Sequence, residues 1–253
     1  MRLGQDAESL RSRLCRLTPD RALTTLDEAV GFLAERGMLT RMPDCALPSL
    51  FAACHEAPAN PAGRGFDLWP KTKWIWSFQL TRGPEALLTK LHRGKSLYLS
   101  MSTARAVDPL VRQTIDSADG DDALLLDHIG RRGPSMTEDV ALELGWEARR
   151  VKQARTRMER LGALVSDGLV FESSTSWYFA PMRRWDQVVE RGAGDDPHGD
   201  VIVAGVRAAV VAPEAEVASW FSWPGSREVV ARLVAEGRLY RPAPGLLAIA
   251  AGG

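Results

Sequence analysis

The chain has 253 residues, 45% of them hydrophobic, and its 32 basic residues balance its 32 acidic residues. This length is sufficient for two or three small domains, and the zero net charge excludes a general polycation while allowing a local basic patch. Three cysteines are too few for a disulfide framework, and no apolar run approaches the roughly 20 residues that a membrane span requires. We therefore expect a cytoplasmic protein without a membrane partner.

The N-terminal residues 1–22 are predicted to form a basic, partly amphipathic arm. Leu10, Leu14 and Leu17 share one face at helical spacing, and Pro19 ends the pattern. This pattern fits a helix that docks on the remainder of the chain, or an arm that follows a nucleic-acid backbone. We favour docking, because an amphipathic helix usually buries its apolar face.

Residues 23–115 are predicted to form a degenerate winged-helix unit with a long insertion. Thr25 and Glu28 form a capping box, which starts a helix that continues to Arg36. A short helix is expected near residues 47–55. A β-hairpin is expected at residues 87–99, with His92-Arg-Gly-Lys95 as its turn. Basic side chains at a turn suit contact with phosphate groups.

The insertion of this unit is rich in cations and aromatic rings. Residues 61–105 hold eight Lys and Arg residues against two acidic residues, and Lys71 and Lys73 lie among aromatic residues. Rings between cations can stack on bases, so the two lysines are candidate DNA contacts. The alternation of Trp74, Trp76 and Phe78 favours a half-buried strand, or packing under a helix, over direct stacking.

Residues 121–191 are predicted to form a central winged-helix unit. A helix over residues 123–131 ends before Gly133-Pro134, and a second helix begins with Thr137 as its N-cap. A third helix, a hairpin with the polar tip Ser173-Ser-Thr-Ser176 and a short helix at residues 183–191 complete the unit. Leu124, Leu125 and Ile129 are expected to face inward from the first helix, and the second helix is apolar through Val140, Leu142 and Leu144.

The third helix of this unit, residues 147–161, is the most informative stretch of the chain. Val151, Ala154 and Met158 form an apolar stripe, and the opposite face is basic and polar. Six Lys and Arg residues against two Glu residues leave a net charge of +4 on this helix. Arg, Lys, Gln and Thr side chains suit the base edges and phosphates of a major groove. A solvated face or a protein-binding surface is the alternative.

Residues 199–253 are predicted to form a C-terminal winged helix. Its third helix, near residues 227–236, carries only two arginines, and two glutamates offset them. We therefore expect this unit to pack against the others or to contact a protein partner. The partner alternative predicts that at least one of three aromatic residues is exposed: Trp220, Phe221 or Trp223. The predicted fold class is mainly α with small β-hairpins (α+β), arranged as tandem winged helix-turn-helix domains.

This pattern resembles the AlkZ/YcaQ-like winged helix DNA-binding family, which includes bacterial DNA glycosylases acting on alkylated or crosslinked bases. The resemblance covers roughly residues 22–190 and points to an AlkZ-related branch. It implies the fold and binding to double-stranded DNA, and hence a nucleoid-associated location. The stretches that carry it are residues 26–37, Leu47-Pro-Ser-Leu-Phe51, Trp69, Lys71, the hairpin at residues 87–99 and the unit at residues 121–181.

Catalytic members of that family carry a Gln-x-Asp or Gln-x-Gln signature, which positions the water that attacks the sugar carbon. Thr40 and Met42 stand at those two positions here, and Asp44 is the nearby carboxylate. A Met side chain cannot orient water, so we carry over the fold and the DNA binding without catalytic residues. Asp44 is the catalytic candidate if the chain is a glycosylase with a non-standard active site.

The sequence gives no sign of a cofactor or a metal. Cys45, Cys54 and His55 match no usual zinc spacing, and we interpret the cysteines as core residues. Motifs for phosphate-cradling loops and zinc peptidases are also missing from the sequence.

Three hypotheses follow. The first is a non-catalytic DNA-binding protein linked to DNA repair or transcription, the second a DNA glycosylase, and the third a scaffold that binds a protein partner through its C-terminal unit. The candidate DNA-binding residues are Arg149, Arg150, Lys152, Gln153, Thr156, Arg160, His92, Arg93, Lys95, Lys71 and Lys73.

Overall fold

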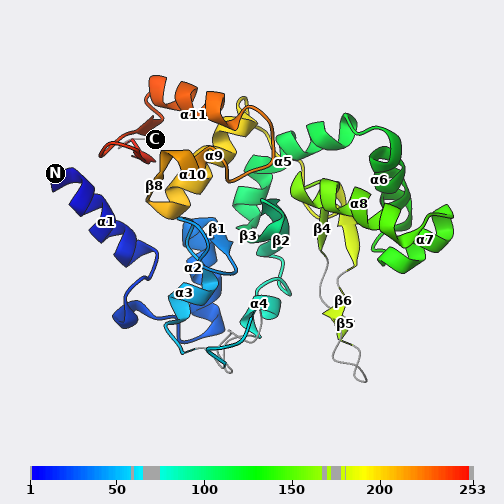
Figure 1. The fold of residues 1–253 in the computed structure, drawn as a ribbon, viewed down its shortest axis with the longest axis horizontal. Coiled ribbons are helices and arrows are strands. Elements are labelled where there is room, and N and C mark those ends of the chain that lie inside the picture. The colour runs from blue at the N-terminus through cyan, green and yellow to red at the C-terminus, as the bar shows by residue number, and fades with distance from the viewer. Residues whose placement is uncertain are drawn as a thin grey trace.

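The computed structural model describes residues 2–57, 60–64, 75–166, 170–171, 178–179 and 181–250. Helices predominate, and the strands pair in small antiparallel sheets (Figure 1). The predicted fold class, mainly α with small β-hairpins, is confirmed. Within the described ranges, no helix has both the length and the apolar character needed to cross a membrane.

The N-terminal helix α1 (Arg2–Leu14) docks on the rest of the chain, as the favoured alternative predicted. The guanidinium of Arg11 donates to the carbonyl of Ala46 at 3.1 Å, and the Cys15 thiol donates to the carbonyl of Ala208 at 3.6 Å. Figure 1 shows the helix at one edge of the molecule, beside the C-terminal unit. After it come the short 3₁₀ helix η1 (Pro19–Arg21) and helix α2 (Leu26–Arg36).

The predicted capping box starts α2. The Thr25 hydroxyl accepts from the backbone N–H of Glu28 at 3.2 Å, and the Glu28 carboxylate accepts from the backbone N–H of Thr24 at 2.7 Å. In a standard capping box the Glu carboxylate accepts from the N–H of the N-cap residue. Here it accepts from Thr24, the residue before the N-cap. The chain continues with β1 (Met38–Thr40), α3 (Leu50–Cys54), α4 (Trp76–Gln79), β2 (Ala86–His92) and β3 (Lys95–Ser100).

Strands β2 and β3 form the hairpin predicted at residues 87–99, and β1 pairs with β3, which gives the sheet order β1-β3-β2. Of the two alternatives for the stretch around Trp76 and Phe78, the half-buried strand is wrong in the described part. Both residues lie in helix α4 and are buried, because their rings face the protein interior from a helical turn.

The central unit contains α6 (Gly120–Arg132), α7 (Thr137–Leu144) and α8 (Ala148–Arg160). Its strands pair as β4 (Leu164–Ser166) with β7 (Met182–Arg184) and as β5 (Val170–Phe171) with β6 (Tyr178–Phe179). In Figure 1 the three helices gather at one end of the molecule, and the paired strands project away from them as a long wing. The wing tip at residues 173–176 lies outside the described residues.

Several local predictions for this unit are wrong. Residues 182–184 continue the wing, and only Trp185–Gln187 form a 3₁₀ turn (η3), because Trp185 is drawn into the core. Leu124 is 53% exposed, whereas Leu125 and Ile129 are buried as predicted, since the buried stripe of α6 runs through Leu125, Leu126 and Ile129. Leu142 of α7 is 83% exposed. Met136 is the N-cap of α7, and the hydroxyl of Thr137 accepts from Arg155 at 3.1 Å.

The C-terminal unit repeats the topology of the first sheet. Helix α5 (Met101–Asp116) leads from the first hairpin towards the central unit and packs on α9 (Pro197–Ala209). The remaining elements are β8 (Val211–Pro213), α10 (Glu214–Val217), α11 (Ser226–Ala235), β9 (Leu239–Tyr240) and β10 (Leu246–Ile249), with the sheet order β8-β10-β9. In both sheets the first strand pairs with the last strand of the hairpin.

The three aromatic residues of this unit are buried, so the prediction that one of them is exposed is wrong. Trp220, Phe221 and Trp223 are 0%, 5% and 6% exposed. Trp220 packs against Gly205 of α9 so closely that a Cβ at that glycine would lie 2.8 Å from the indole ring. The aromatic residues fill an internal contact, which leaves none of the three for a partner protein.

The apolar side chains form three cores. The largest joins the first hairpin, α5, α9 and the C-terminal unit, the second lies within the first unit, and the third belongs to the central helices and wing. The first and C-terminal units therefore pack as one body around shared residues. The division at residues 22, 115, 121, 191 and 199 stays a prediction.

A buried carboxylate links α5 to the segment that follows the wing. Asp108 has no exposed surface and accepts hydrogen bonds from Arg112 at 2.8 and 2.9 Å, from the Trp185 indole at 2.9 Å and from the backbone N–H of Gly192 at 2.9 Å. A buried charge is stable only when its lone pairs are satisfied in this way.

We predict that Asp108→Ala lowers the free energy of unfolding by about 3–5 kcal/mol, because the buried partners lose their acceptor. Urea unfolding followed by tryptophan fluorescence measures the change. Asp116→Ala, at the exposed end of the same helix, serves as the control and should shift stability by less than about 0.5 kcal/mol. Equal effects of the two substitutions would contradict this role for Asp108.

Candidate nucleic-acid interface

Helix α8 is the second helix of a helix-turn-helix and presents one apolar and one polar face. Val151, Ala154 and Met158 are buried against α6 and α7, as the sequence predicted. Gly145 takes a left-handed conformation (φ 64°) and lets the chain turn between α7 and α8. The opposite face is exposed and consists of five of the predicted DNA-binding residues: Arg149, Lys152, Gln153, Thr156 and Arg160.

Ion pairs divide the cations of α8 into two groups. Arg150 holds Asp121 with two hydrogen bonds, at 2.9 and 2.5 Å, and its guanidinium lies 4.2 Å from the centroid of the Trp146 ring. Arg157 holds Asp122 in the same way, at 2.7–3.1 Å. The bond from Arg150 lowers the pKa of the Asp121 carboxyl, so this pair stays ionised at neutral pH.

The other group carries uncompensated charge. In the part of the chain that the structure describes, Arg149, Lys152 and Arg160 make no ion pair. They lie on one face with Gln153 and Thr156 between them, at spacings of three and four residues. The local positive charge of α8 is therefore smaller than its composition indicates, but it is concentrated on the face that points to solvent.

A second buried carboxylate attaches α8 to the first hairpin. Glu159 is 3% exposed and accepts from Lys90 of β2 at 2.5 Å and from Arg155 at 2.8 Å. Arg155 is consequently engaged inside the protein and does not belong to the exposed face. This contact places the hairpin beside the C-terminal end of α8.

The predicted phosphate-binding turn lies at this junction. Gly94 adopts φ +79°, and a Cβ on it would lie 2.8 Å from Nε of Arg160, so the two stretches that the sequence singled out touch each other. Arg93 is exposed but donates to the carbonyl and hydroxyl of Ser219 at 2.8 and 2.5 Å. Lys95 forms an ion pair with Asp44. Both cations thus lie near α8, but contacts within the protein already use part of their hydrogen-bonding capacity and charge.

His92 must be removed from the predicted DNA surface. Its side chain has no exposed surface, so it cannot reach a phosphate in this conformation. Burial also lowers the pKa of the His92 imidazole, with a smaller opposing effect from Asp44, and so favours the neutral ring. The turn begins one residue later than the sequence pattern indicated, because His92 still belongs to β2.

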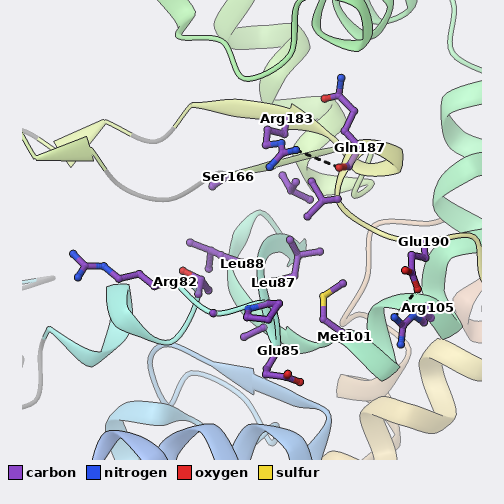
Figure 2. Close-up of a pocket in the computed structure, with 16 residues that line it drawn as sticks. Arg82, Glu85, Leu87, Leu88, Met101, Arg105, Ser166, Arg183, Gln187 and Glu190 are labelled. Atoms are coloured by element: carbon purple, nitrogen blue, oxygen red, sulfur yellow. Dashed lines mark hydrogen bonds and ion pairs between the residues drawn. The ribbon is translucent and has the colours of Figure 1, made fainter.

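A cleft of about 780 Å³ opens between the first hairpin and the wing (Figure 2). One wall comes from residues 81–88 and Met101, and the other from Val165, Ser166 and the segment around Arg183. Figure 2 shows that Arg82 lies at the edge of the first wall, and that Arg105 pairs with Glu190, at 2.6 Å. A volume of this size accommodates a small organic group such as a nucleobase.

Sequence reasoning missed the residues that line this cleft. The excess of cations in residues 61–105 was the available signal, and Arg82 and Arg105 belong to that stretch. Arg183 and Ser166 lie far from them in the sequence, so the sequence does not show that these residues line the same cleft. The candidates Lys71 and Lys73, together with Trp69, lie outside the described residues.

The signature positions are part of the protein interior. Thr40 is 2% exposed, and its hydroxyl lies 2.9 Å from the carbonyl of Met42, to which it donates. Met42 packs on the core of the first unit. Asp44 is exposed but held by Lys95, and it does not line the cleft.

Comparisons with known proteins show which solved structure has a similar fold. No protein-family model matches the chain, and no curated protein matches it. Among solved structures, it is similar to the Streptomyces sahachiroi DNA glycosylase AlkZ, with a TM-score of 0.58 and 10% sequence identity. The match covers 97% of this chain and 69% of the AlkZ chain. The likeness shows a common fold over nearly the whole chain, and supports the AlkZ/YcaQ-like architecture.

Proposed function

We propose that this protein binds double-stranded DNA through tandem winged helices, with the exposed face of α8 in the major groove. The observation that carries the proposal is the stripe Arg149, Lys152, Gln153, Thr156 and Arg160 on the second helix of a helix-turn-helix. In such motifs the second helix lies in the major groove. At 1.5 Å rise per residue the stripe is about 16 Å long, enough to follow several base pairs.

The neighbouring surfaces fit the same geometry. The turn at Arg93 and Lys95 and the described strands of the wing, β5 and β6, would follow the phosphate backbone near α8. The cations of the stripe would supply the sequence-independent part of the affinity, which falls with salt as counterions are released. Gln153 and Thr156 would contact base edges.

The first test is fluorescence anisotropy of a plain duplex across a salt series, beside the same duplex with a bulky alkylated base. A steep decrease of affinity with salt supports DNA binding, and tighter binding of the modified duplex supports a role in repair. Absence of binding to either duplex at low salt would remove the proposal.

We predict that the double substitution Arg149→Glu, Lys152→Glu weakens duplex binding on the order of 10- to 100-fold near 0.1 M salt. It should also reduce the slope of log affinity against log salt by about 2, because two phosphate contacts are lost. The control is Arg227→Glu, an exposed arginine on the corresponding helix α11, which should change affinity by less than about twofold if α8 is the reading helix. Equal losses in both variants would point to non-specific charge effects.

Breaking an ion pair of α8 is predicted to strengthen DNA binding. Asp122→Asn releases Arg157 and should tighten duplex binding about 2- to 5-fold and steepen the salt slope by about 1. Asp119→Asn removes the same charge from the start of α6, where the aspartate makes no capping hydrogen bond. If the two variants bind DNA alike, Arg157 contributes nothing to the interface.

A DNA glycosylase activity is the second candidate, and the fold shared with AlkZ over 97% of the chain favours it. An enzyme that acts on a base must take the base into a pocket, and the cleft beside the wing is large enough. Glu85 and Glu190 are the carboxylates that line it. Asp44, by contrast, lies in the loop after β1, near His92 at the far end of β2. At 3.3 Å per residue along that strand it is roughly 20 Å from Glu85.

Base release from an alkylated duplex tests this candidate. We predict that any turnover is reduced more by Glu85→Gln than by Asp44→Asn, since only the former changes the cleft. A larger loss in Asp44→Asn would restore Asp44 as the catalytic group, and absence of base release from several lesion types would leave DNA binding alone.

A further inference from the structure

Three side chains with metal-binding atoms meet at the junction of the first and C-terminal units. Asp44 and Cys45 lie in the loop after β1, and His92 ends β2. One ligand atom from each lies within 4.8 Å of the others, and no second group of this kind occurs in the described part of the chain. The sequence separates His92 from the other two by more than 45 positions, so no spacing motif reveals the group.

His92 is the unusual member of this group. It is fully buried, and although its ring interacts with the backbone of Trp220, neither ring nitrogen makes a hydrogen bond of good geometry. An unsatisfied buried polar group destabilises the folded state, so such a ring needs a compensating partner.

The surrounding atoms are placed for coordination. Nε2 of His92 lies 3.9 Å from Oδ1 of Asp44, too far for a hydrogen bond. Two ligand atoms at about 2 Å from one tetrahedral ion are roughly 3.3 Å apart, so a small movement brings both atoms onto an ion. The other oxygen of Asp44 is held by Lys95, which orients the carboxylate.

The loop that carries Asp44 and Cys45 is held in position by the C-terminal unit. The backbone N–H of Ala46 donates to the Glu216 carboxylate at 2.5 Å, and the same carboxylate accepts from the Trp220 indole at 2.9 Å. His92 pairs by a β-bridge with Phe221. Three segments that are distant in sequence therefore converge on the cluster.

We propose that Asp44, Cys45 and His92 form a Zn²⁺ site with a fourth position open to solvent at the side of Asp44. A thiolate, an imidazole and a carboxylate are together a donor set that Zn²⁺ prefers, and three protein ligands leave one coordination position for water. The ion would fasten the loop of residues 41–47 to the first hairpin. This inference does not depend on DNA binding.

Metal content and spectroscopy of the full chain test the proposal. After treatment with a chelator, the protein is titrated with Zn²⁺ or with Co²⁺ as the spectroscopic probe. We expect one ion per chain, a thiolate-to-cobalt charge-transfer band, and a rise in melting temperature with Zn²⁺ concentration. Binding well below one ion per chain, or a cobalt spectrum without a thiolate band, would overturn the site.

Matched variants identify the ligands. Cys45→Ser should abolish the charge-transfer band and weaken Zn²⁺ binding on the order of 100-fold or more, because the loss of a ligand exceeds the loss of a supporting contact. Cys54→Ser is the control, since that buried thiol donates to the carbonyl of Leu50 and lies outside the cluster. Equal binding by both variants would overturn the site.

Asp44→Asn, at an exposed position, supplies a second test that does not depend on how Cys45→Ser folds. It should weaken Zn²⁺ binding while circular dichroism stays unchanged. Unchanged affinity would remove Asp44 from the ligand set and leave too few protein ligands for the site.

Discussion

The buried carboxylate of Glu159 fixes how the central unit sits on the rest of the molecule. It lies on α8 but faces inward, where Lys90 of the first hairpin and Arg155 of the same helix hold it. A buried charge with two cationic partners tolerates little movement, because loss of either partner leaves it uncompensated. The orientation of α8, and with it the exposed stripe, depends on this contact. Asp108 plays the corresponding part between α5 and the segment after the wing.

The basic helix illustrates why charge composition and charge presentation differ. Its six cations serve three purposes: Arg155 is internal, Arg150 and Arg157 are paired with the acidic start of α6, and the remaining three are exposed. Surface ion pairs of this type contribute little to stability, but they remove charge from a potential interface. The acidic residues of α6 thereby confine the unpaired positive charge of α8 to the exposed stripe, and in the proposed complex they would limit non-specific attraction to DNA.

The structural similarity to AlkZ establishes a common fold and does not establish a common reaction. At 10% identity, side chains at equivalent places need not correspond, and function depends on the site and not on the fold. In this chain the stretch around Thr40 and Met42 packs into the core, while a cleft with its own carboxylates opens beside the wing. The loop after Met42 instead brings Asp44 and Cys45 to His92, so this part of the fold carries a different set of functional groups.

The sequence alone determined the features that depend on neighbouring residues. Helical periodicity located α8 and its two faces, the Thr25 capping box located the start of α2, and apolar stretches on both sides of a polar turn located the first hairpin. These patterns are local, because a helix or a hairpin turn repeats within a few positions. The exposed stripe of the candidate interface could therefore be predicted residue by residue.

Only the tertiary structure decided which side chains are exposed for binding and which are buried or paired within the protein. Leu124 is exposed although its helix pattern predicted burial, and the aromatic residues around Trp220 are buried although they could have formed a surface. The pairing of Arg157 with Asp122, the burial of His92, and the meeting of His92 with Cys45 all join residues far apart in sequence. Such contacts depend on how preformed elements pack against one another, and a local pattern of residues contains no information about that packing.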